Sequence, residues 1–470
     1  MKERHMYKGL CRLGKAKVHQ ETSVQRTNPL VWWAVCSFAT ILGFSRLSYG
    51  LLLPALRTDL GGSYSVYGTL GTVNFVGYLV GTLALSLMLA QARQRLALNL
   101  FASCAMSITL FASGWSFTLW QLGVWRFLNG FFAAFATVLT LALTLECIPA
   151  QTRGKVSGLI WAGGAIGIVF SGLIAPFILA AGNTAGWRIV WMGMGMVGVV
   201  SAVGFARTRA AFSSSPASPT PAQESSSAKF SPQPLWVMLR PLFQPHRLLF
   251  LTLSYCSFGC GYIIYFTFFV ALLEQQGVSV LSAGFIWAGI GLAGALSGWM
   301  WGKIMDRWPT GFALALPLLL GAGGAVSVLG HNQGWEYVGA ALIGLCAFIA
   351  PALMVTALLK RAVANEDYAA SLSMLTAFFA IGQIVGPLIS SFIVERNSLV
   401  VGTASSALIL GLAAVCACGY GMMQQRTHRT HVHRVQREDE GVSLLTHQVA
   451  FDPEKVTGEE REGDEARAEA

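Results

Sequence analysis

Apolar residues between positions 31 and 421 fall into twelve stretches of about 19 to 27 residues, separated by short polar breaks. A hydrocarbon core about 30 Å thick requires roughly 20 helical residues to cross it, so each stretch is long enough to span a membrane. The pattern predicts an all-α polytopic membrane protein with twelve transmembrane helices. These spans are predicted at Val31–Leu53, Val66–Ala90, Leu96–Gly114, Leu119–Leu145, Val156–Ala181, Trp187–Ala206, Leu248–Leu273, Leu281–Trp301, Gly311–Gly330, Trp335–Leu359, Ala370–Val394 and Val400–Gly421.

The polar segments around these spans divide the chain into five parts. Residues 1–30 form a basic N-tail, and residues 31–206 form a first six-helix bundle. A Ser/Pro-rich linker at 207–247 includes SSSPASPTPAQESSS, a composition that cannot build a core. A second six-helix bundle follows at 248–421. The tail at 422–470 is rich in His and Arg and then acidic, which predicts disorder.

The distribution of charge supports the membrane assignment and orients the chain. Charged residues make up only 11% of the sequence, against about 25% in soluble proteins. With a cytoplasmic N-terminus, 24 Lys and Arg residues lie on the inner side and three on the outer side. This bias predicts a multi-pass protein of the cell membrane with both termini cytoplasmic. The net charge of +10 is therefore not a nucleic-acid footprint.

Three sequence offsets indicate that the two bundles are repeats. An offset of 216 aligns Gly43 with Gly259 and Tyr49 with Tyr265. Offsets of 217 and 215 align GYLVG with GALSG and AIG with AIG. Glycines also recur four apart on the second, fifth, eighth and eleventh spans, a spacing that lets helix backbones approach closely. Two interpretations remain open: static packing, or smooth faces on which the two bundles rock.

Several motifs resemble those of the major facilitator superfamily. GWMWGKIMDRW (Gly298–Trp308) is similar to its loop with a glycine and a cytoplasmic Asp-Arg, and LGVWRFLNGFFAA (Leu122–Ala134) to its helix-4 motif. GQIVGP (Gly382–Pro387) looks like its helix-5 motif, and LECIPAQTRGKVSG (Leu145–Gly158) has its Arg-Gly entry to helix 5. The resemblance covers about residues 30–421, closest to a poorly characterised bacterial branch. It implies two pseudo-symmetric bundles that transport a solute by alternating access.

One departure from the family pattern concerns gating. The first bundle has Leu85 and Leu89 where the second has Gly302 and Asp306. The resemblance implies that an aspartate there pairs across the inner face and stabilises the outward-open state. The candidate gating residues are therefore confined to Gly302, Asp306 and Arg307, acting alone or with Arg153.

Two arginines lie within spans, where an inserted charge is costly and usually faces a cavity. Arg46 lies past the middle of the first span and Arg126 in the outer half of the fourth. Arg46 could instead snorkel to the interface, and Arg126 could be a structural cation bound to carbonyls. The acidic residues Glu146, Glu274 and Glu395 lie at span ends. Two cations without matching acids favour an organic anion as substrate.

Other polar or aromatic residues within spans are candidates for the same cavity. Each could equally serve as a contact between helices, because an amide in lipid must face protein or water. These candidates for substrate binding, beside Arg46 and Arg126, are Tyr49, Asn74, Tyr78, Asn129, Tyr262, Tyr265 and Gln383.

The sequence carries no signature of an enzyme. It has no phosphate-cradling Gly-Lys-Ser/Thr loop, its His residues fall mainly in tails and loops, and its nine cysteines lack metal spacing. We therefore expect no cofactor, no metal site and no nucleic-acid partner. The predicted function is secondary transport of a small solute by a monomer in the lipid bilayer, coupled to an ion such as the proton. The alternative is a non-transporting sensor or scaffold on the same fold.

Overall fold

A computed structural model describes residues 29–89, 95–149, 151–181, 185–208, 246–330 and 333–450, and all its regular elements in these ranges are helices. In the N-half (29–208), residues 29–38 are helical and lead into the π-helix η1. The remaining N-half elements and those of the C-half (246–450) are η1 (Ala39–Leu47), α2 (Ser48–Leu60), α3 (Tyr64–Leu89), α4 (Arg95–Gly114), α5 (Leu119–Glu146), α6 (Arg153–Ala181), α7 (Gly186–Arg207), α11 (His246–Gln275), α12 (Val280–Arg307), α13 (Gly311–Val326), η3 (Ser327–Leu329), α14 (Gln333–Cys346), α15 (Ala350–Ala362), α16 (Asn365–Arg396) and α17 (Leu399–Ala450).

The predicted number of membrane passes is confirmed over the described residues. Eleven helices are long and apolar enough to cross a membrane, and the apolar Gly311–Val326 is shorter. The tenth pass is broken between Cys346 and Ala350, and α15 restarts with Pro351 in its first turn. Proline is tolerated there because the first turn of a helix needs no donor from that position.

The C-terminal part differs from the sequence prediction. Helix α17 continues to Ala450, whereas the sequence predicts that the last span ends near Gly421 and a disordered tail follows. No proline occurs between Leu399 and Pro453, so nothing in the local chain stops the helix. The N-tail up to 28, most of the linker (209–245) and residues 451–470 lie outside the described residues.

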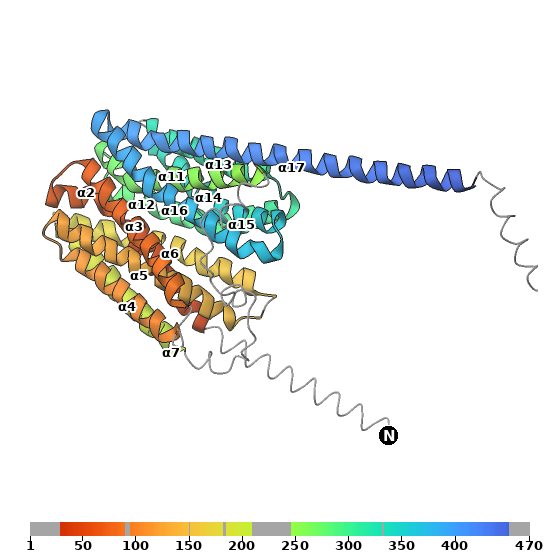
Figure 1. Ribbon diagram of the computed structural model, residues 1–470. Helices are drawn as coiled ribbons and strands as arrows, with labels where there is room; N and C mark the ends of the chain where they lie inside the picture. Colours follow the sequence, from red (N-terminus) through yellow and green to blue (C-terminus); the bar gives the residue numbers. More distant parts are fainter. Residues whose placement is uncertain are drawn as a thin grey trace, which may run out of the picture.

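The two halves form two groups of helices, from red to yellow-green and from green to blue in Figure 1. The tail side is the end where the first helix begins and from which α17 extends, and the far side is the opposite end. Helix α11 is the most enclosed span, with 89% of its most apolar window buried. It packs against α16 and α17 of its own half and against α2 of the other.

The halves contact each other in the middle and on the far side. A Cβ atom added to Gly50 would lie 1.8 Å from the carbonyl oxygen of Phe266, and one on Gly172 would lie 2.6 Å from that of Gly284. These glycines allow backbones of opposite halves to touch. On the tail side, by contrast, Gly154 and Gly302 have open space around the Cβ position. The two halves are therefore in backbone contact on the far side.

The glycine pairs that the sequence analysis linked to rocking do not form the contact between the halves. The helices that bear them do meet across the halves, as α3 with α16 and α6 with α12. The paired glycines, however, mostly contact a helix of their own half. The nearest neighbours of their Cβ positions are Phe127 for Gly77, Phe131 for Gly81, Val35 for Gly163, Ala39 for Gly167, Cys256 for Gly382 and Cys260 for Gly386. The packing interpretation is correct for these pairs, and other small residues form the interface.

Candidate functional site

Arg46 lies at the end of a π-helix in the middle of the first span. The segment Ala39–Leu47 has π-helical hydrogen bonding, and the Ser48 hydroxyl donates to the carbonyl oxygen of Gly43 at 2.8 Å. At Gly43 the helix lies so close to Gly167 that an added Cβ would be 2.6 Å from its Cα. π-Helical turns are rare in proteins, and those that occur are often found at functional sites. No pattern in the sequence predicts this one.

The Arg46 side chain connects the two halves. Its guanidinium carbon lies 4.2 Å from the ring centroid of Tyr78 and 4.8 Å from that of Phe75, both on α3. Its Nη2 atom donates to Oε1 of Gln383, on α16 of the C-half, at 3.0 Å. The side chain is half-buried, and among the described residues its buried Nε has no hydrogen-bond partner. This cation therefore faces two rings and a neutral amide, with no ion pair in the described chain.

Gln383 continues the site into the C-half. Its Nε2 atom donates to the hydroxyl of Tyr262 on α11. The Tyr262 ring stacks on Phe258 at 5.1 Å and lies nearly parallel to Phe379, 5.9 Å away. The structure thus brings together four predicted site residues, Arg46, Tyr78, Tyr262 and Gln383, from one end of a polar chain to the other.

Arg126 occupies a separate site inside the N-half. Only 1% of it is exposed, and its Nη1 atom donates to the carbonyl oxygen of Ser45 at 2.6 Å. The rings of Tyr49 and Trp191 lie 4.7 and 6.0 Å from its guanidinium carbon. A cation that bonds to a carbonyl inside one bundle has the contacts of a structural cation. This is the alternative role for Arg126 that the sequence analysis left open. Binding of substrate by Arg126 stays a prediction.

Two asparagines complete this internal polar cluster. Oδ1 of Asn129 accepts from the Ser45 hydroxyl at 2.5 Å and from Nδ2 of Asn74 at 3.2 Å. Nδ2 of Asn129 donates to the carbonyl oxygen of Met106 at 2.9 Å, and Nδ2 of Asn74 to that of Arg126. Both asparagines are fully buried. In this conformation they join four helices of the N-half rather than line an open space.

The two tyrosines of the predicted repeat are also buried. The Tyr49 hydroxyl donates to the carbonyl oxygen of Tyr67 at 2.6 Å. The Tyr265 ring stacks on Phe269 at 4.3 Å. Tyr265 also interacts electrostatically with Glu336, a carboxylate in the first turn of α14 that is only 2% exposed. The sequence analysis missed Glu336, which is a buried acid. Its place at the start of a span hid how deeply the carboxylate is enclosed.

The predicted gating residues are not engaged in this conformation. Asp306 and Arg307 are exposed, and neither has an ion pair within the described chain. Nε of Arg153 donates to the carbonyl oxygen of Ile148 at 2.9 Å, and Gly302 borders open space. The tail side of the N-half instead has an ion pair of 2.7 Å between Arg95 and Glu146, which the sequence analysis missed.

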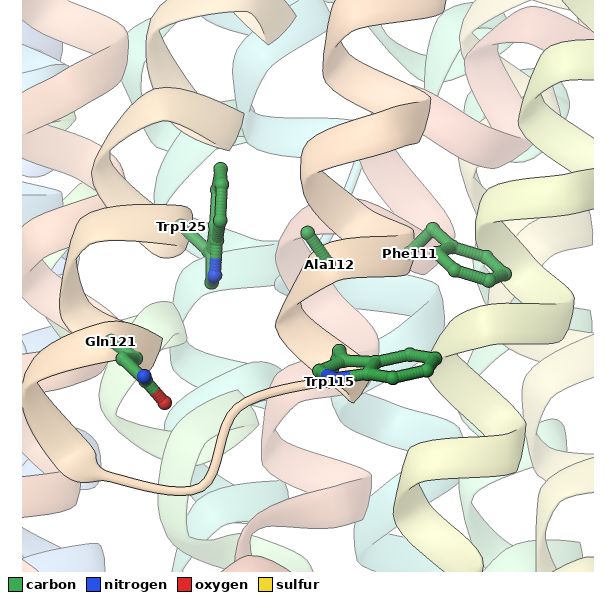
Figure 2. A pocket seen from close by; sticks show the side chains of 5 residues that line it. All are labelled: Phe111, Ala112, Trp115, Gln121 and Trp125. Carbon is green, nitrogen blue, oxygen red and sulfur yellow. The ribbon is translucent and has the colours of Figure 1, made fainter.

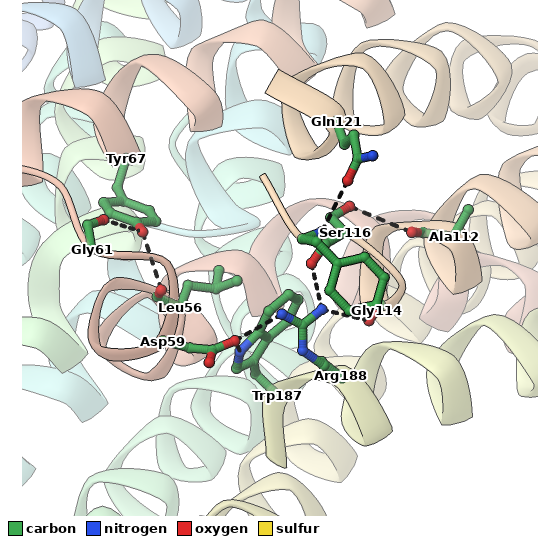
Figure 3. A network of polar contacts seen from close by, with 11 residues as sticks. Leu56, Asp59, Gly61, Tyr67, Ala112, Gly114, Ser116, Gln121, Trp187 and Arg188 are labelled. Atoms are coloured by element: carbon green, nitrogen blue, oxygen red, sulfur yellow. Dashed lines mark hydrogen bonds and ion pairs between the residues drawn. The ribbon is translucent and has the colours of Figure 1, made fainter. Parts of the chain in front are cut away.

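Figure 3 shows a polar network on the far side of the N-half. Oδ2 of Asp59 on α2 accepts from Nε1 of Trp187 at 3.0 Å and from Nη2 of Arg188 at 2.9 Å. Arg188 also donates to the carbonyl oxygen of Ser116 in the connection between α4 and α5. The network joins the end of α2, the start of α7 and the connection between α4 and α5, all in one half, and contains no predicted site residue.

A cavity of about 330 Å³ lies between α4 and α5, beside this network (Figure 2). Its lining residues are Phe111, Ala112, Trp115, Gln121 and Trp125. The lining is mostly apolar and belongs to one half, so this cavity is distinct from the Arg46 site between the halves.

Comparison with known proteins places this geometry in a family context. A family model described as "Uncharacterised MFS-type transporter YbfB" matches residues 38–421. The chain is 29% identical over 147 residues to "Putative metabolite transport protein YyaJ" of Bacillus subtilis, covering 31% of the chain and 32% of that relative. It is 25% identical over 286 residues to a "Putative metabolite transport protein" of Haemophilus influenzae, covering 56% and 64%. The chain thus aligns with less than two thirds of the length of either relative.

Solved structures share the fold at low sequence identity. The nucleoside transporter NupG superposes with a TM-score of 0.61 at 14% identity, over 84% of this chain and 99% of that one. A bacterial homologue of the lysosomal transporter Spinster, inward-facing and unoccupied, gives 0.60 at 14% identity over 85% and 95%. A D-xylose–proton symporter gives 0.60 at 16% identity over 83% and 96%.

Proposed function

Because the chain belongs to the major facilitator superfamily transporters of the uncharacterised YbfB type, we propose that it carries a small organic anion across the membrane by alternating access, driven by an ion gradient. The observation that carries this proposal is Arg46. It is a half-buried cation between the two halves that contacts both and has no ion pair in the described chain.

The chemistry of Arg46 supports an anionic ligand. A guanidinium that is withdrawn from water is stabilised by an opposite charge, and its planar fork matches the two oxygens of a carboxylate. Tyr78 and Phe75 contribute cation–π attraction but bear no charge, and Gln383 offers only an amide oxygen. A bound carboxylate would supply the missing charge.

The packing of the halves supports access from alternate sides. Backbone contacts such as Gly50 with Phe266 join the halves on the far side, whereas Gly154 and Gly302 on the tail side have no neighbour within 4 Å of the Cβ position. Arg46 lies between the halves, so it would become accessible from the far side if these contacts separated. An ion gradient is proposed as the driving force because no phosphate-cradling motif for ATP occurs in the sequence.

Uptake into proteoliposomes tests the proposal. The full-length protein is supplied with labelled acetate, lactate, succinate and benzoate, with the neutral solutes glucose and uridine, and with choline, each with and without a pH gradient. We expect uptake of at least one anion, reduced at least about tenfold by Arg46→Ala and partly retained by Arg46→Lys. Arg57→Ala, which removes an exposed arginine from the same span, is the matched control and should leave uptake unchanged.

Two results would overturn the proposal. One is uptake of neutral solutes or choline while no anion is moved. The other is anion uptake that Arg46→Ala leaves intact. Binding of an anion without uptake under any gradient would favour the sensor alternative on the same fold.

A further inference from the structure

Aromatic side chains gather around the polar chain of Arg46 and Gln383 from both halves. On the C-half, Tyr255 stacks on Phe379 at 4.6 Å with 16° between the ring planes, and Tyr262 lies parallel to Phe379 within 10°. Phe258 stacks between them at 5.6 Å from Phe379. On the N-half, Tyr78 lies over Arg46 and within electrostatic range of both Tyr255 and Tyr262.

Four rings share one orientation in this group, whereas stacked rings elsewhere in the described chain occur in single pairs. Aromatic pairs inside proteins adopt many angles, and edge-to-face contacts are common among them. Elsewhere in this protein single pairs are stacked, such as Tyr49 with Trp191 at 16° and Tyr265 with Phe269 at 20°, and others such as Phe131 with Phe132 are nearly perpendicular. In the C-half group, the angles among Tyr255, Phe258, Tyr262 and Phe379 range from 10° to 24°. The group presents stacked faces of one orientation.

The position of this group points to a ligand rather than to lipid. Tyr262 is joined to Arg46 through Gln383, so the stack begins at the cation. Tyr255 lies about two helical turns nearer the tail side on the same helix α11. Phe379 and Tyr78 are only half-buried, on opposite halves, although α11 beside them is almost wholly enclosed. The helices that bear these two rings, α3 and α16, contact each other across the halves.

We propose that the substrate is an aromatic carboxylate, whose carboxylate binds Arg46 and whose planar ring lies between Tyr78 and the C-half stack headed by Phe379. This inference rests on the proposed function and specifies its substrate class. An aliphatic anion of equal charge would satisfy Arg46 but gain nothing from parallel rings. A neutral aromatic compound would stack but leave Arg46 without its counter-charge.

Binding of matched probes tests the inference on the purified full-length protein. Benzoate and cyclohexanecarboxylate have the same charge and nearly the same size but differ in aromaticity, and benzamide keeps the ring without the charge. By titration calorimetry we expect benzoate to bind at least about fivefold more tightly than cyclohexanecarboxylate, and benzamide to bind no better than the latter. Phe379→Leu should reduce the ratio of the two anions to below about twofold by removing the stacking face.

Two further variants keep the test decisive. Tyr255→Leu removes a second ring and should lower the ratio as well, which serves if Phe379→Leu fails to fold. Phe392→Leu removes a largely exposed phenylalanine from the same helix α16, and should leave the ratio unchanged. Arg46→Gln should abolish binding of both anions.

The outcomes separate this inference from the proposed function. Equal binding of benzoate and cyclohexanecarboxylate, both lost in Arg46→Gln, would overturn the aromatic class and leave the anion transporter standing. A preference for benzoate that both Phe379→Leu and Tyr255→Leu retain would also overturn it. Absence of binding by either anion at saturating concentrations, with benzamide bound, would overturn both proposals.

Discussion

The two halves of this protein have one fold but different chemistry at matching positions. The offset of 216 that relates Gly43 to Gly259 also relates Arg46 to Tyr262 and Gly50 to Phe266. In the N-half, the first span contains a π-helix and lies on a buried network of arginine and asparagine side chains. In the C-half, the equivalent α11 is one continuous α-helix bordered by stacked rings.

This difference assigns a different mechanical role to each half. Hydrogen bonds between buried groups are directional, so the N-half network holds Arg46's helix in one position relative to its neighbours. Contacts between ring faces and small residues tolerate sliding better, because they depend on area rather than on the angle of a bond. The N-half thus holds the cation through directional hydrogen bonds, whereas the C-half borders it with an amide and ring faces.

The largest effect is expected from breaking the N-half network. Asn129→Leu keeps the branched shape of the side chain but removes four hydrogen bonds, from Ser45 and Asn74 and to Met106 and Thr109. Side-chain hydrogen bonds within membranes average about 0.6 kcal/mol, so the free energy of unfolding should fall by about 2 kcal/mol. Thermal unfolding of the purified protein, followed by a thiol-reactive dye, measures the loss.

Ser254→Ala supplies the matched control in the C-half. The buried Ser254 hydroxyl makes one hydrogen bond, to the carbonyl oxygen of Ala413 at 2.8 Å. Its loss should therefore cost no more than about 0.6 kcal/mol. Equal melting temperatures for the two variants would contradict a special role for the N-half network.

A smaller effect, on conformation rather than stability, is expected at the far-side contact between the repeats. Gly50 touches the backbone of its own counterpart Phe266, so Gly50→Val cannot fit without separating the halves there. Ser391, which is 2% exposed beneath Gly68, reports the opening when changed to cysteine. We expect Gly50→Val to raise its maleimide labelling about tenfold, a shift of about 1.4 kcal/mol toward a far-side-open state.

Gly289→Val is the control for this experiment, because nothing lies within 4 Å of the Cβ position of Gly289 on α12. It should leave labelling of the Ser391→Cys reporter unchanged, after subtraction of the labelling of the native cysteines. If Gly50→Val also left it unchanged, the Gly50–Phe266 contact would not be what closes the far side.

The sequence predicted the membrane passes and the fold because apolar length and local motifs determine them. Each span is a continuous apolar run, and motifs such as Arg126 with Gly130 lie within one helix. The pairing of Arg46 with Gln383 could not be predicted in this way, since the two residues are 337 positions apart and meet only when the halves pack.

What the sequence missed depends on packing or on small energy differences. Asn74 and Asn129 each had two possible roles, and burial in a four-helix contact is visible only in three dimensions. Glu336 lies at the edge of an apolar run, so a search for charges within spans treats it as part of a span end. The π-helix at Ala39–Leu47 contains no proline or other local signal that would predict it. It coincides with the close packing of Gly43 on Gly167, which is visible only in three dimensions.

The smallest expected effect distinguishes the ring contact of Arg46 in the N-half from its amide contact in the C-half. Tyr78 offers its face to the guanidinium at 4.2 Å, so the ring, and not the hydroxyl, should position the cation. Tyr78→Leu should weaken benzoate binding about threefold, in line with a cation–π contribution of about 0.5–1 kcal/mol, and Tyr78→Phe should change it by less than about twofold. Calorimetry on both variants decides the point. Equal losses in the two would mean that the hydroxyl of Tyr78 contributes to binding, and that its contact with Arg46 does not rest on the ring face alone.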